Sequence, residues 1–249
     1  MTTSLPGRVL VVGATSGLAR QVSDQLARRG HSLVLAGRNL KQVRALVDDL
    51  QVSYPETEIV AAAEAFDAVD FSRHQDLLVG AGQIEGLILC HGTLIQPEAA
   101  EGDFAAVKQM IDINFTSCVS LLMVAGAYFQ DHGRGFICAL SSVAGDRGRP
   151  SNYAYGATKA ALSAYLSGMR ARLARHGVRV ITIKPGIVDT AMTWGQPVRG
   201  PVASADRVAR DICRAIEKGH SVVYTPWYWR PIMAMIRALP EPIFRRLNF

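Results

Sequence analysis

The chain has 249 residues, a length that suits one α/β domain better than two. Its residues are 49% hydrophobic and 19% charged, which excludes a disordered chain and is typical of a globular protein. The formal net charge of +6 fits a basic surface, an anionic cofactor, an anionic substrate or an anionic membrane. Lysine and arginine form no long run, so we do not expect nucleic acid as a partner.

The four cysteines form no CxxC pair, which argues against a disulfide framework and against a metal site of the zinc type. Most of them stand in apolar stretches, where a free cysteine behaves as a small hydrophobic residue. The first residues lack a basic region followed by a long apolar core, so we expect no signal peptide. The predicted location is the cytoplasm, with contact to the inner face of the membrane as an open alternative.

Short apolar runs alternate along the chain with segments of helical periodicity. The runs that predict buried strands are residues 8–12, 32–36, 59–63, 87–90, 135–140, 178–183 and 221–224. The segments that predict helices are residues 17–29, 39–52, 71–81, 101–131, 153–176 and 204–218. Continuous apolar strands that alternate with helices predict an α/β fold with a parallel sheet covered on both faces.

A glycine turn with GxxxGxA spacing, Gly13 to Ala19, follows the first predicted strand. Gly13 allows a tight turn, Gly17 lets the backbone approach a pyrophosphate, and the small Ala19 permits close packing of helix on strand. The N-terminus of the following helix offers N–H donors and a partial positive charge to phosphates. A plain tight turn is the alternative, but the place at the first strand–helix junction favours a dinucleotide site.

The second predicted strand ends at Gly37-Arg38-Asn39. A carboxylate at this place would bind the adenosine ribose of NAD, and none is present. Arg38 can pair with the 2′-phosphate of NADP instead, and Ser16 can add a hydroxyl. The sequence therefore predicts NADP(H) as the cofactor, with a surface arginine that binds no ligand as the alternative.

Residues 113–130 carry no charge and approach the length that spans a membrane. Several polar residues interrupt this stretch, so a buried helix of a sheet protein is the better interpretation. Asn114 stands inside the helix, where an asparagine is unfavourable unless it has a role such as holding a water. An amide satisfied within the core is the alternative.

Tyr155 and Lys159 are one helical turn apart and share a face, whereas Tyr153 lies on roughly the opposite side. A nearby ammonium lowers the pKa of a tyrosine from its reference of about 10, so the phenol can act as an acid or base. Reduction of a carbonyl by hydride needs such a group to deliver a proton to the developing alkoxide. The YxxxK spacing alone is weak evidence, but Ser142, thirteen residues before Tyr155, offers a hydroxyl to the same oxygen.

The end of the chain differs in composition from the rest. The Gly- and Pro-containing segment 194–202 predicts a mobile substrate lid at about 189–205. We expect a catalytic domain over 1–226 and an aromatic, basic tail over 227–249. The tail has an apolar face formed by Trp229, Ile232, Met233, Ile236 and Leu239. A basic amphipathic helix of this kind can lie at an anionic membrane surface, close the substrate pocket or pack in a dimer.

The chain resembles the short-chain dehydrogenase/reductase family over residues 8 to about 225. The resemblance is carried by four features that occur in the family's order: the GxxxGxA turn, INFTS, the Ser–Tyr–Lys spacing and KPGIVDT. The resemblance implies a single-domain, Rossmann-like doubly wound parallel sheet of seven strands. It also implies NADPH-dependent reduction of a ketone to an alcohol by hydride transfer. In that chemistry Tyr155 would donate the proton, and Ser142 would orient the carbonyl. Lys159 would hold the nicotinamide ribose, and Asn114 would anchor the water of a proton relay.

The resemblance also implies which residues meet the cofactor. Asp67 matches an acidic residue that meets the adenine, and residues 185–190 match the segment around the nicotinamide. The family's Asn-Ala-Gly is replaced by Cys90-His91-Gly92, in which Gly92 keeps the close backbone approach. His91 can touch the ribose or act only through its backbone. The expected cofactor contacts are Gly13, Thr15, Ser16, Gly17, Leu18, Arg38, Asn39, Asp67, Ala68, His91, Gly92, Tyr155, Lys159, Pro185, Gly186, Val188 and Thr190.

Residues 90–93, residues 141–173 and the ending from YTPWYW onward are similar to the reductase partner of decaprenylphosphoryl-ribose 2-epimerase and its bacterial relatives. This narrower resemblance implies a lipid-linked 2-keto sugar as substrate and an FAD-dependent oxidase that makes it. A general carbonyl or hydroxysteroid-type dehydrogenase and a non-catalytic NADP-binding sensor stay open as alternatives. The family resemblance implies a homodimer or homotetramer packed through helices 101–131 and 153–176.

Overall fold

The structure is a computed structural model that describes residues 7–95, 102–194 and 200–246. Position 101 of a predicted helix, residues 195–199 of the expected lid and residues 247–249 of the tail lie outside the described residues.

Seven parallel strands form one sheet in the order β3-β2-β1-β4-β5-β6-β9. The strands are β1 (Arg8–Val12), β2 (Ser32–Ala36), β3 (Ile59–Ala61), β4 (Ile84–Leu89), β5 (Gly135–Leu140), β6 (Val178–Pro185) and β9 (Val222–Thr225). The predicted seven-stranded parallel sheet is confirmed, although the ends of four strands differ from the predicted ones. The parallel register follows from the helical crossovers, because a parallel pair cannot be joined by a tight hairpin.

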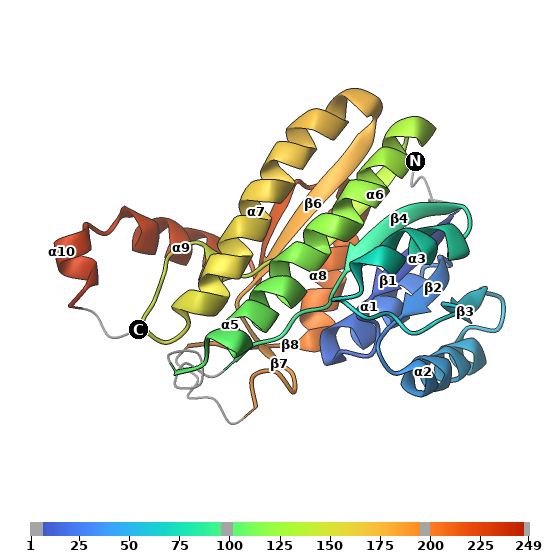
Figure 1. The fold of residues 1–249 in the computed structure, drawn as a ribbon, viewed down its shortest axis with the longest axis horizontal. Coiled ribbons are helices and arrows are strands. Elements are labelled where there is room, and N and C mark those ends of the chain that lie inside the picture. The colour runs from blue at the N-terminus through green and yellow to red at the C-terminus, as the bar shows by residue number, and fades with distance from the viewer. Residues whose placement is uncertain (1–6, 96–101, 195–199, 247–249) are drawn as a thin grey trace.

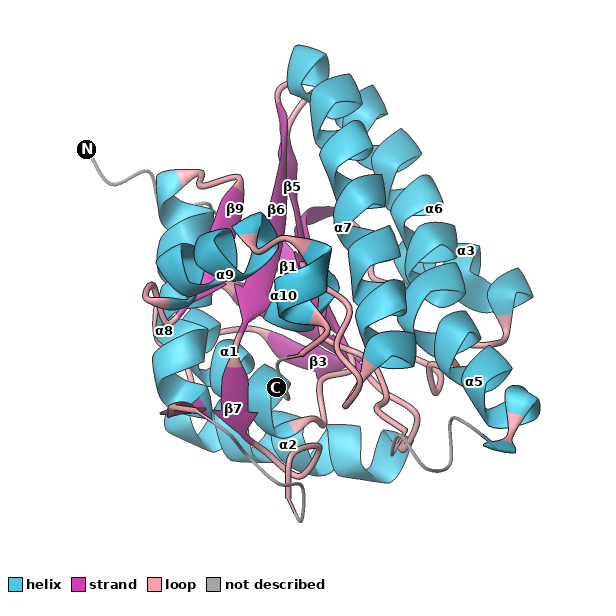
Figure 2. Cartoon of the chain, turned by 90° about the vertical axis from the view of Figure 1, so that its left-hand side faces the viewer, coloured by secondary structure: helices cyan, strands magenta, loops and turns pink. Residues whose placement is uncertain are grey.

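Helices cover both faces of this sheet (Figure 1). The described helices are α1 (Gly17–Ala27), α2 (Leu40–Ser53), α3 (His74–Gly80), α5 (Phe104–Ile111), α6 (Ser117–His132), α7 (Tyr153–Leu173), α8 (Ala205–Lys218), α9 (Trp229–Ala238) and α10 (Glu241–Phe244). Figure 2 shows α6 and α7 on one side of the strands and α1 and α8 on the other.

Successive residues of each strand alternate between two hydrophobic cores. Val9 and Val11 of β1 pack in the core that includes α1, α2 and α8. Leu10 and Val12 pack in the core that includes α3, α6 and α7. Because both faces of the sheet are buried, the strands are apolar without alternation, as the sequence pattern indicated.

The strand order reverses between β1 and β4, because β2 and β3 lie on one side of β1 and the later strands on the other. In open sheets of this type a crevice forms at the carboxyl ends of the strands at such a reversal. Here the N–H of Cys90 donates to the carbonyl of Val12 at 2.9 Å. Gly13 has φ +81°, and a Cβ on it would lie 2.7 Å from the backbone nitrogen of His91. The fold thus places the first glycine turn beside the segment that follows β4.

The predicted helix over 101–131 is wrong as one continuous helix. It is divided into α5 and α6 by a π-helical turn, Asp112–Thr116, in which the N–H of Ser117 donates to the carbonyl of Asp112. Single π turns inside α-helices occur frequently at functional sites, because they change the direction in which side chains point. This turn contains Asn114.

The helical run Phe104–His132 is long and apolar enough to cross a membrane by length and composition, with a mean hydropathy of 1.6. Leu121, Leu122 and Phe129 on this run are nevertheless fully buried in the core of the sheet. The run therefore has the burial of a core helix, as we interpreted it from the sequence.

In two other predicted helices, 71–81 and 153–176, one end of the predicted range is a 3₁₀ turn instead of α-helix. A 3₁₀ turn, Phe71–Arg73, precedes α3, and another, Ala174–His176, follows α7. The expected lid also contains regular structure that its sequence did not indicate. Two short strands, β7 (Ile187–Asp189) and β8 (Val202–Ser204), pair in parallel and bring the two ends of the lid together.

The tail packs against the loop that follows β5. Trp229, Met233 and Ile236 of α9 are buried in a small third cluster that also holds Val143 and Phe244. Arg147 of the same loop forms an ion pair with Glu241 at 2.6 Å, and its guanidinium lies over the Phe244 ring at 4.3 Å. Figure 1 shows the tail, coloured red, beyond α7 at one edge of the molecule.

Replacement of Phe136 by alanine should lower the free energy of unfolding by about 3–5 kcal/mol, because the ring is fully buried in β5 and the cavity cannot collapse. Phe104→Ala serves as the control, since that ring is 78% exposed and its loss should change the free energy by less than about 0.5 kcal/mol. Urea unfolding followed by circular dichroism measures both. Equal effects of the two substitutions would contradict the assignment of the core.

All four cysteines are buried free thiols. Burial raises the pKa of the Cys90 and Cys213 thiols to about 12 and that of Cys118 to about 11, and it raises the pKa of Cys138 well above its ordinary value. Since the thiolate is the reactive form, Ellman's reagent at pH 8 should label none of them in the folded protein and all of them in guanidinium chloride. Rapid labelling of a folded thiol would contradict this packing.

Candidate active site

Tyr155 and Lys159 lie one turn apart on α7, with the Lys159 ammonium 5.8 Å from the centroid of the Tyr155 ring. The lysine is only 3% exposed, and its Nζ donates a hydrogen bond to the carbonyl of Leu140 at 2.9 Å. Tyr153, in contrast, is 49% exposed. The structure therefore brings Tyr155, and not Tyr153, together with the lysine.

The loop after β5 is pressed against α7 at two glycines. A Cβ on Gly145 would lie 2.7 Å from the backbone nitrogen of Ala160. A Cβ on Gly156 would lie 2.7 Å from the carbonyl oxygen of Ala144. Backbone meets backbone at both places, so this approach is possible only without side chains. It fixes the position of Ser142, which immediately precedes this loop turn.

Two hydrogen bonds, one made by Ser141 and one by Ser142 itself, fix the position of Ser142. The preceding Ser141 donates from its hydroxyl to the carbonyl of Lys159 at 2.9 Å. Ser142 itself accepts a hydrogen bond from the N–H of Ala144 at 3.1 Å. A hydroxyl that accepts from a backbone N–H still carries its own hydrogen. Ser142 can therefore donate that hydrogen to the oxygen of a bound carbonyl.

Asn114 is fully buried and ties the segment after β4 to α7. Its Oδ1 accepts from the N–H of Thr93 at 2.7 Å, and its Nδ2 donates to the Thr93 carbonyl at 2.8 Å and to Thr158 Oγ1 at 3.3 Å. Thr158 in turn donates to the carbonyl of Tyr155 at 2.7 Å. Both amide hydrogens are used, and one acceptor position on Oδ1 remains for the expected water.

The sequence analysis missed Thr93 and Thr158. They are 21 and 44 residues from Asn114, and no local pattern marks either of them. They become partners of Asn114 only because the loop after β4, the π turn and α7 pack together in the folded protein.

Two helix N-termini are capped by residues that we expected at the cofactor. Ser16 accepts from the N–H of Ala19 at 3.3 Å and caps α1. Asn39 accepts from the N–H of Gln42 at 3.1 Å and caps α2. The free N–H groups and the positive dipole end of α1 make its start a suitable site for a pyrophosphate.

Glycines keep a cradle open between these elements. A Cβ on Gly17 would have Thr190 as its nearest neighbour, at 3.7 Å, so the start of α1 faces the segment after β7. A Cβ on Gly92 would lie 3.2 Å from Asn114 Oδ1 and 3.5 Å from Lys159 Nζ. The residues expected at the pyrophosphate and at the nicotinamide thus lie on loops at the carboxyl ends of the central strands, where folds of this type bind a dinucleotide.

Arg38 is exposed at the end of β2, and the ion pairs among the described residues do not include it. Thr15 lies beside it in space, because a Cβ on Gly37 would be 3.5 Å from the Thr15 side chain. Arg20, which the sequence analysis missed, donates from Nε to the carbonyl of Thr15 at 3.3 Å. Two guanidinium groups therefore flank the first turn and can meet a phosphate.

Asp67 is exposed on the loop that follows β3. Its carboxylate accepts from the N–H of Val69 at 3.0 Å. The loop is tied to the end of β2, because the N–H of Phe66 donates to the carbonyl of Gly37 at 3.1 Å. Asp67 thus lies on the same edge of the sheet as Arg38.

His91 has one ring nitrogen without a partner. Its Nε2 bonds Ser117 Oγ at 2.7 Å, and Ser117 donates to the carbonyl of Ile113 at 2.6 Å. Ser117 must therefore accept from His91, which leaves Nδ1 as a buried, unpartnered acceptor. Burial lowers the pKa of His91 to about 3, so the ring is neutral. A buried acceptor without a partner fits a hydroxyl group of a bound cofactor.

Besides Lys159, four of the expected cofactor contacts have buried side chains, and these four apolar residues can offer a ligand only their backbone groups. They are Leu18, Ala68, Pro185 and Val188.

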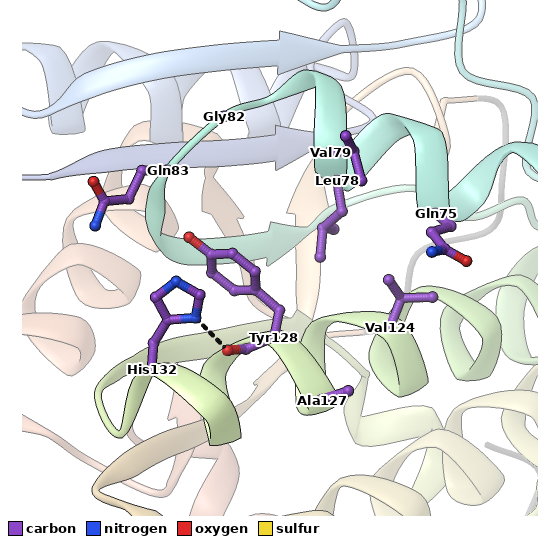
Figure 3. A pocket seen from close by; sticks show the side chains of 9 residues that line it. All are labelled: Gln75, Leu78, Val79, Gly82, Gln83, Val124, Ala127, Tyr128 and His132. Carbon is purple, nitrogen blue, oxygen red and sulfur yellow. Dashed lines mark hydrogen bonds between the residues drawn. The ribbon is translucent and has the colours of Figure 1, made fainter.

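A separate cavity of about 620 Å³ lies between α3 and α6. Figure 3 shows it lined by side chains such as Leu78, Val124 and Tyr128, with His132 bonded to the Tyr128 carbonyl at 2.7 Å. The lining contains none of the residues that the sequence assigned to catalysis or to the cofactor. The cavity is therefore separate from the candidate active site at the carboxyl ends of the strands.

Comparison with known proteins identifies the family of the chain. The family model for short chain dehydrogenases matches residues 8–198. An uncharacterized oxidoreductase of Mycobacterium tuberculosis is 34% identical over 246 residues, which cover 96% of each chain.

Two solved structures share the fold. A short-chain dehydrogenase from Sphingobium yanoikuyae, in complex with NADPH, has a TM-score of 0.82 and 23% identity, with 95% of this chain and 97% of that chain covered. A bulky-bulky ketone specific alcohol dehydrogenase from Comamonas testosteroni has a TM-score of 0.79 and 21% identity, with 96% of each chain covered. The fold, the family model and the relative agree, and the chain belongs to the short-chain dehydrogenase/reductase family of NAD(P)-dependent oxidoreductases.

Proposed function

We propose that this protein reduces a ketone to an alcohol with NADPH. The observation that carries the proposal is the packing of Tyr155 and the buried Lys159 of α7 against the loop that carries Ser142. A phenol, a buried ammonium and a serine hydroxyl that still carries its hydrogen are the groups that carbonyl reduction needs. A binding module would require none of them at this spacing, which weighs against the alternative of a non-catalytic NADP-binding sensor.

The nicotinamide, when bound, supplies the hydride that the carbonyl carbon accepts. Ser142 donates a hydrogen bond to the carbonyl oxygen and fixes its direction. Tyr155 transfers its phenolic proton to that oxygen as negative charge develops on it. The alcohol is then complete, and the tyrosine is left as a phenolate.

The Lys159 ammonium lies 5.8 Å from the centroid of the Tyr155 ring and is almost fully buried, so its positive charge favours that phenolate. It also faces the space beside Gly92, where it can bind a ribose hydroxyl. Asn114 holds this arrangement together through Thr93 and Thr158, and its free acceptor position can bind the water that returns a proton.

The cofactor preference for NADP(H) rests on Arg38. Its unpaired guanidinium stands at the end of β2, where a carboxylate would be expected for NAD. The exposed Ser16 and the guanidinium of Arg20 lie on the adjoining turn and add donors for a phosphate. The similar dehydrogenase from Sphingobium yanoikuyae holds NADPH, which supports the same preference here.

The substrate beyond a ketone stays a prediction. A lipid-linked 2-keto sugar, and an oxidase that supplies it, rest on the resemblance of the tail alone. A general carbonyl or hydroxysteroid-type dehydrogenase would use the same catalytic groups. The ketone named for the Comamonas testosteroni enzyme belongs to that protein, but it supports a ketone as the substrate class.

For the tail we propose packing on its own domain rather than contact with a membrane. The buried positions of Trp229, Met233 and Ile236 use most of the apolar face that a membrane would require. We also propose a homo-oligomer that packs through α6 and α7. Met123 of α6 and Tyr153 of α7 are 61% and 49% exposed in the single chain, and a second copy would cover them.

Tyr155→Phe should lower kcat for ketone reduction by about 10²–10⁴-fold, because the proton donor is removed while the ring remains. Binding of NADPH, measured by its fluorescence, should change less than about twofold, since the cradle is untouched. Tyr153→Phe is the matched control and should retain kcat. Unchanged turnover in Tyr155→Phe would refute the mechanism.

Arg38→Asp should lower kcat/KM with NADPH by about 10- to 100-fold and raise the relative use of NADH, since a charge-assisted contact is replaced by repulsion. Arg134→Asp makes the same charge change at the opposite end of the sheet, before β5, and should leave the preference intact. Steady-state kinetics with both cofactors give the two ratios. An unaltered NADPH preference in Arg38→Asp would rule out this role.

A further inference from the structure

The described part of the chain has six buried side-chain polar atoms without a hydrogen-bond partner. They are Ser23 Oγ, His31 Nδ1, His91 Nδ1, Arg149 Nε, Asn152 Oδ1 and Trp229 Nε1. Because buried polar groups are nearly always bonded in folded proteins, each orphan atom calls for a reason. The indole N–H of Trp229 is notable because it belongs to the tail and yet packs against Gly186, one of the residues expected at the cofactor.

Trp229 contacts three segments that carry or adjoin residues expected at the cofactor and the substrate. Its indole covers Gly186 at the end of β6, where an added Cβ would overlap Nε1. A Cβ on Gly200, at the far end of the lid, would lie 3.8 Å from the Trp229 ring. Trp229 also shares a hydrophobic cluster with Val143, the residue after Ser142. The ring is only 6% exposed, so no bulk water satisfies its N–H.

We propose that Trp229 forms a wall of the substrate site and that its indole N–H donates a hydrogen bond to a second oxygen of the ketone. The substrate class is then a ketone that carries a hydroxyl or another oxygen near its carbonyl. The inference rests on the proposed ketone reduction.

The chemistry of the wall supports this class. Val143, Met233 and Ile236, which share the cluster with the indole, have side chains without an oxygen that could accept from it. Binding sites use a few such polar groups in apolar walls to fix orientation and specificity. A plain ketone would leave the indole N–H without an acceptor, which weakens its binding in the transition state. A ketone with a second oxygen would accept a hydrogen bond from this N–H.

The first experiment compares ketones that differ by one hydroxyl, acetoin against butanone and benzoin against deoxybenzoin. Trp229→Phe keeps an aromatic ring and removes the N–H. It should lower kcat/KM for the hydroxyketones about tenfold and for the plain ketones less than about twofold. Trp227→Phe is the matched control, because that indole is 71% exposed and its loss should leave both values unchanged. The decisive quantity is the ratio within each pair, since a hydroxyl also changes the intrinsic reactivity of the carbonyl.

If the wild-type protein reduces both members of a pair and Trp229→Phe leaves their ratio unchanged, the inference is overturned and the proposed function stands. If the wild-type protein reduces none of these ketones or any other ketone with NADPH, the proposed function itself fails.

A second measurement needs no folded Trp229 variant. The chain has three tryptophans, so a ¹⁵N-labelled wild-type protein gives three indole signals, and Trp194→Phe and Trp227→Phe assign them. In the presence of NADP⁺, acetoin should shift the Trp229 indole proton downfield, whereas butanone should not. Equal shifts with both ketones, or none with acetoin at saturation, would overturn the inference.

Discussion

Close packing of α7 on the end of β5 is the constraint on which the whole site depends. Gly145 and Gly156 allow backbone to meet backbone there, and the buried ammonium of Lys159 donates to the carbonyl of Leu140. A charge this deep is costly unless it is bonded, so the lysine is fixed at one place. Tyr155, one turn earlier, is fixed with it, and the catalytic groups need no ligand to bring them together.

A second set of polar contacts ties β6 and β9 to the loop that follows β5. Lys184 and Asp146 form an ion pair at 2.5 Å, and Tyr224 donates to the second carboxylate oxygen of Asp146 at 2.7 Å. Burial and this hydrogen bond raise the pKa of Tyr224 to about 12, so its proton stays in the bond. The same loop carries Ser142, which we propose for catalysis, and Arg147, which forms an ion pair with Glu241 of the tail. The position of Ser142 and the packing of the tail therefore depend on one loop.

The sequence predicted more of the sheet than of the helices. A strand buried on both faces must be apolar along its length, so each strand was visible as a run. The break at Asp112–Thr116 was not visible, because a π turn has the same apolar pattern as the α-helix around it. The short pair β7 and β8 was also missed, since three-residue strands carry too little pattern to be distinguished from a loop.

By itself, the sequence determined what depends on near neighbours along the chain. The one-turn spacing of Tyr155 and Lys159 places them on one face in any helix. The tight turn at Gly13 has a positive φ of 81°, a backbone conformation that favours glycine. Only the tertiary structure decided which distant groups meet. The bonds of Asn114 to Thr93 and Thr158 and the burial of Trp229 against Gly186 join segments far apart in the chain. Such contacts arise from the packing of whole elements, and no local pattern of residues encodes them.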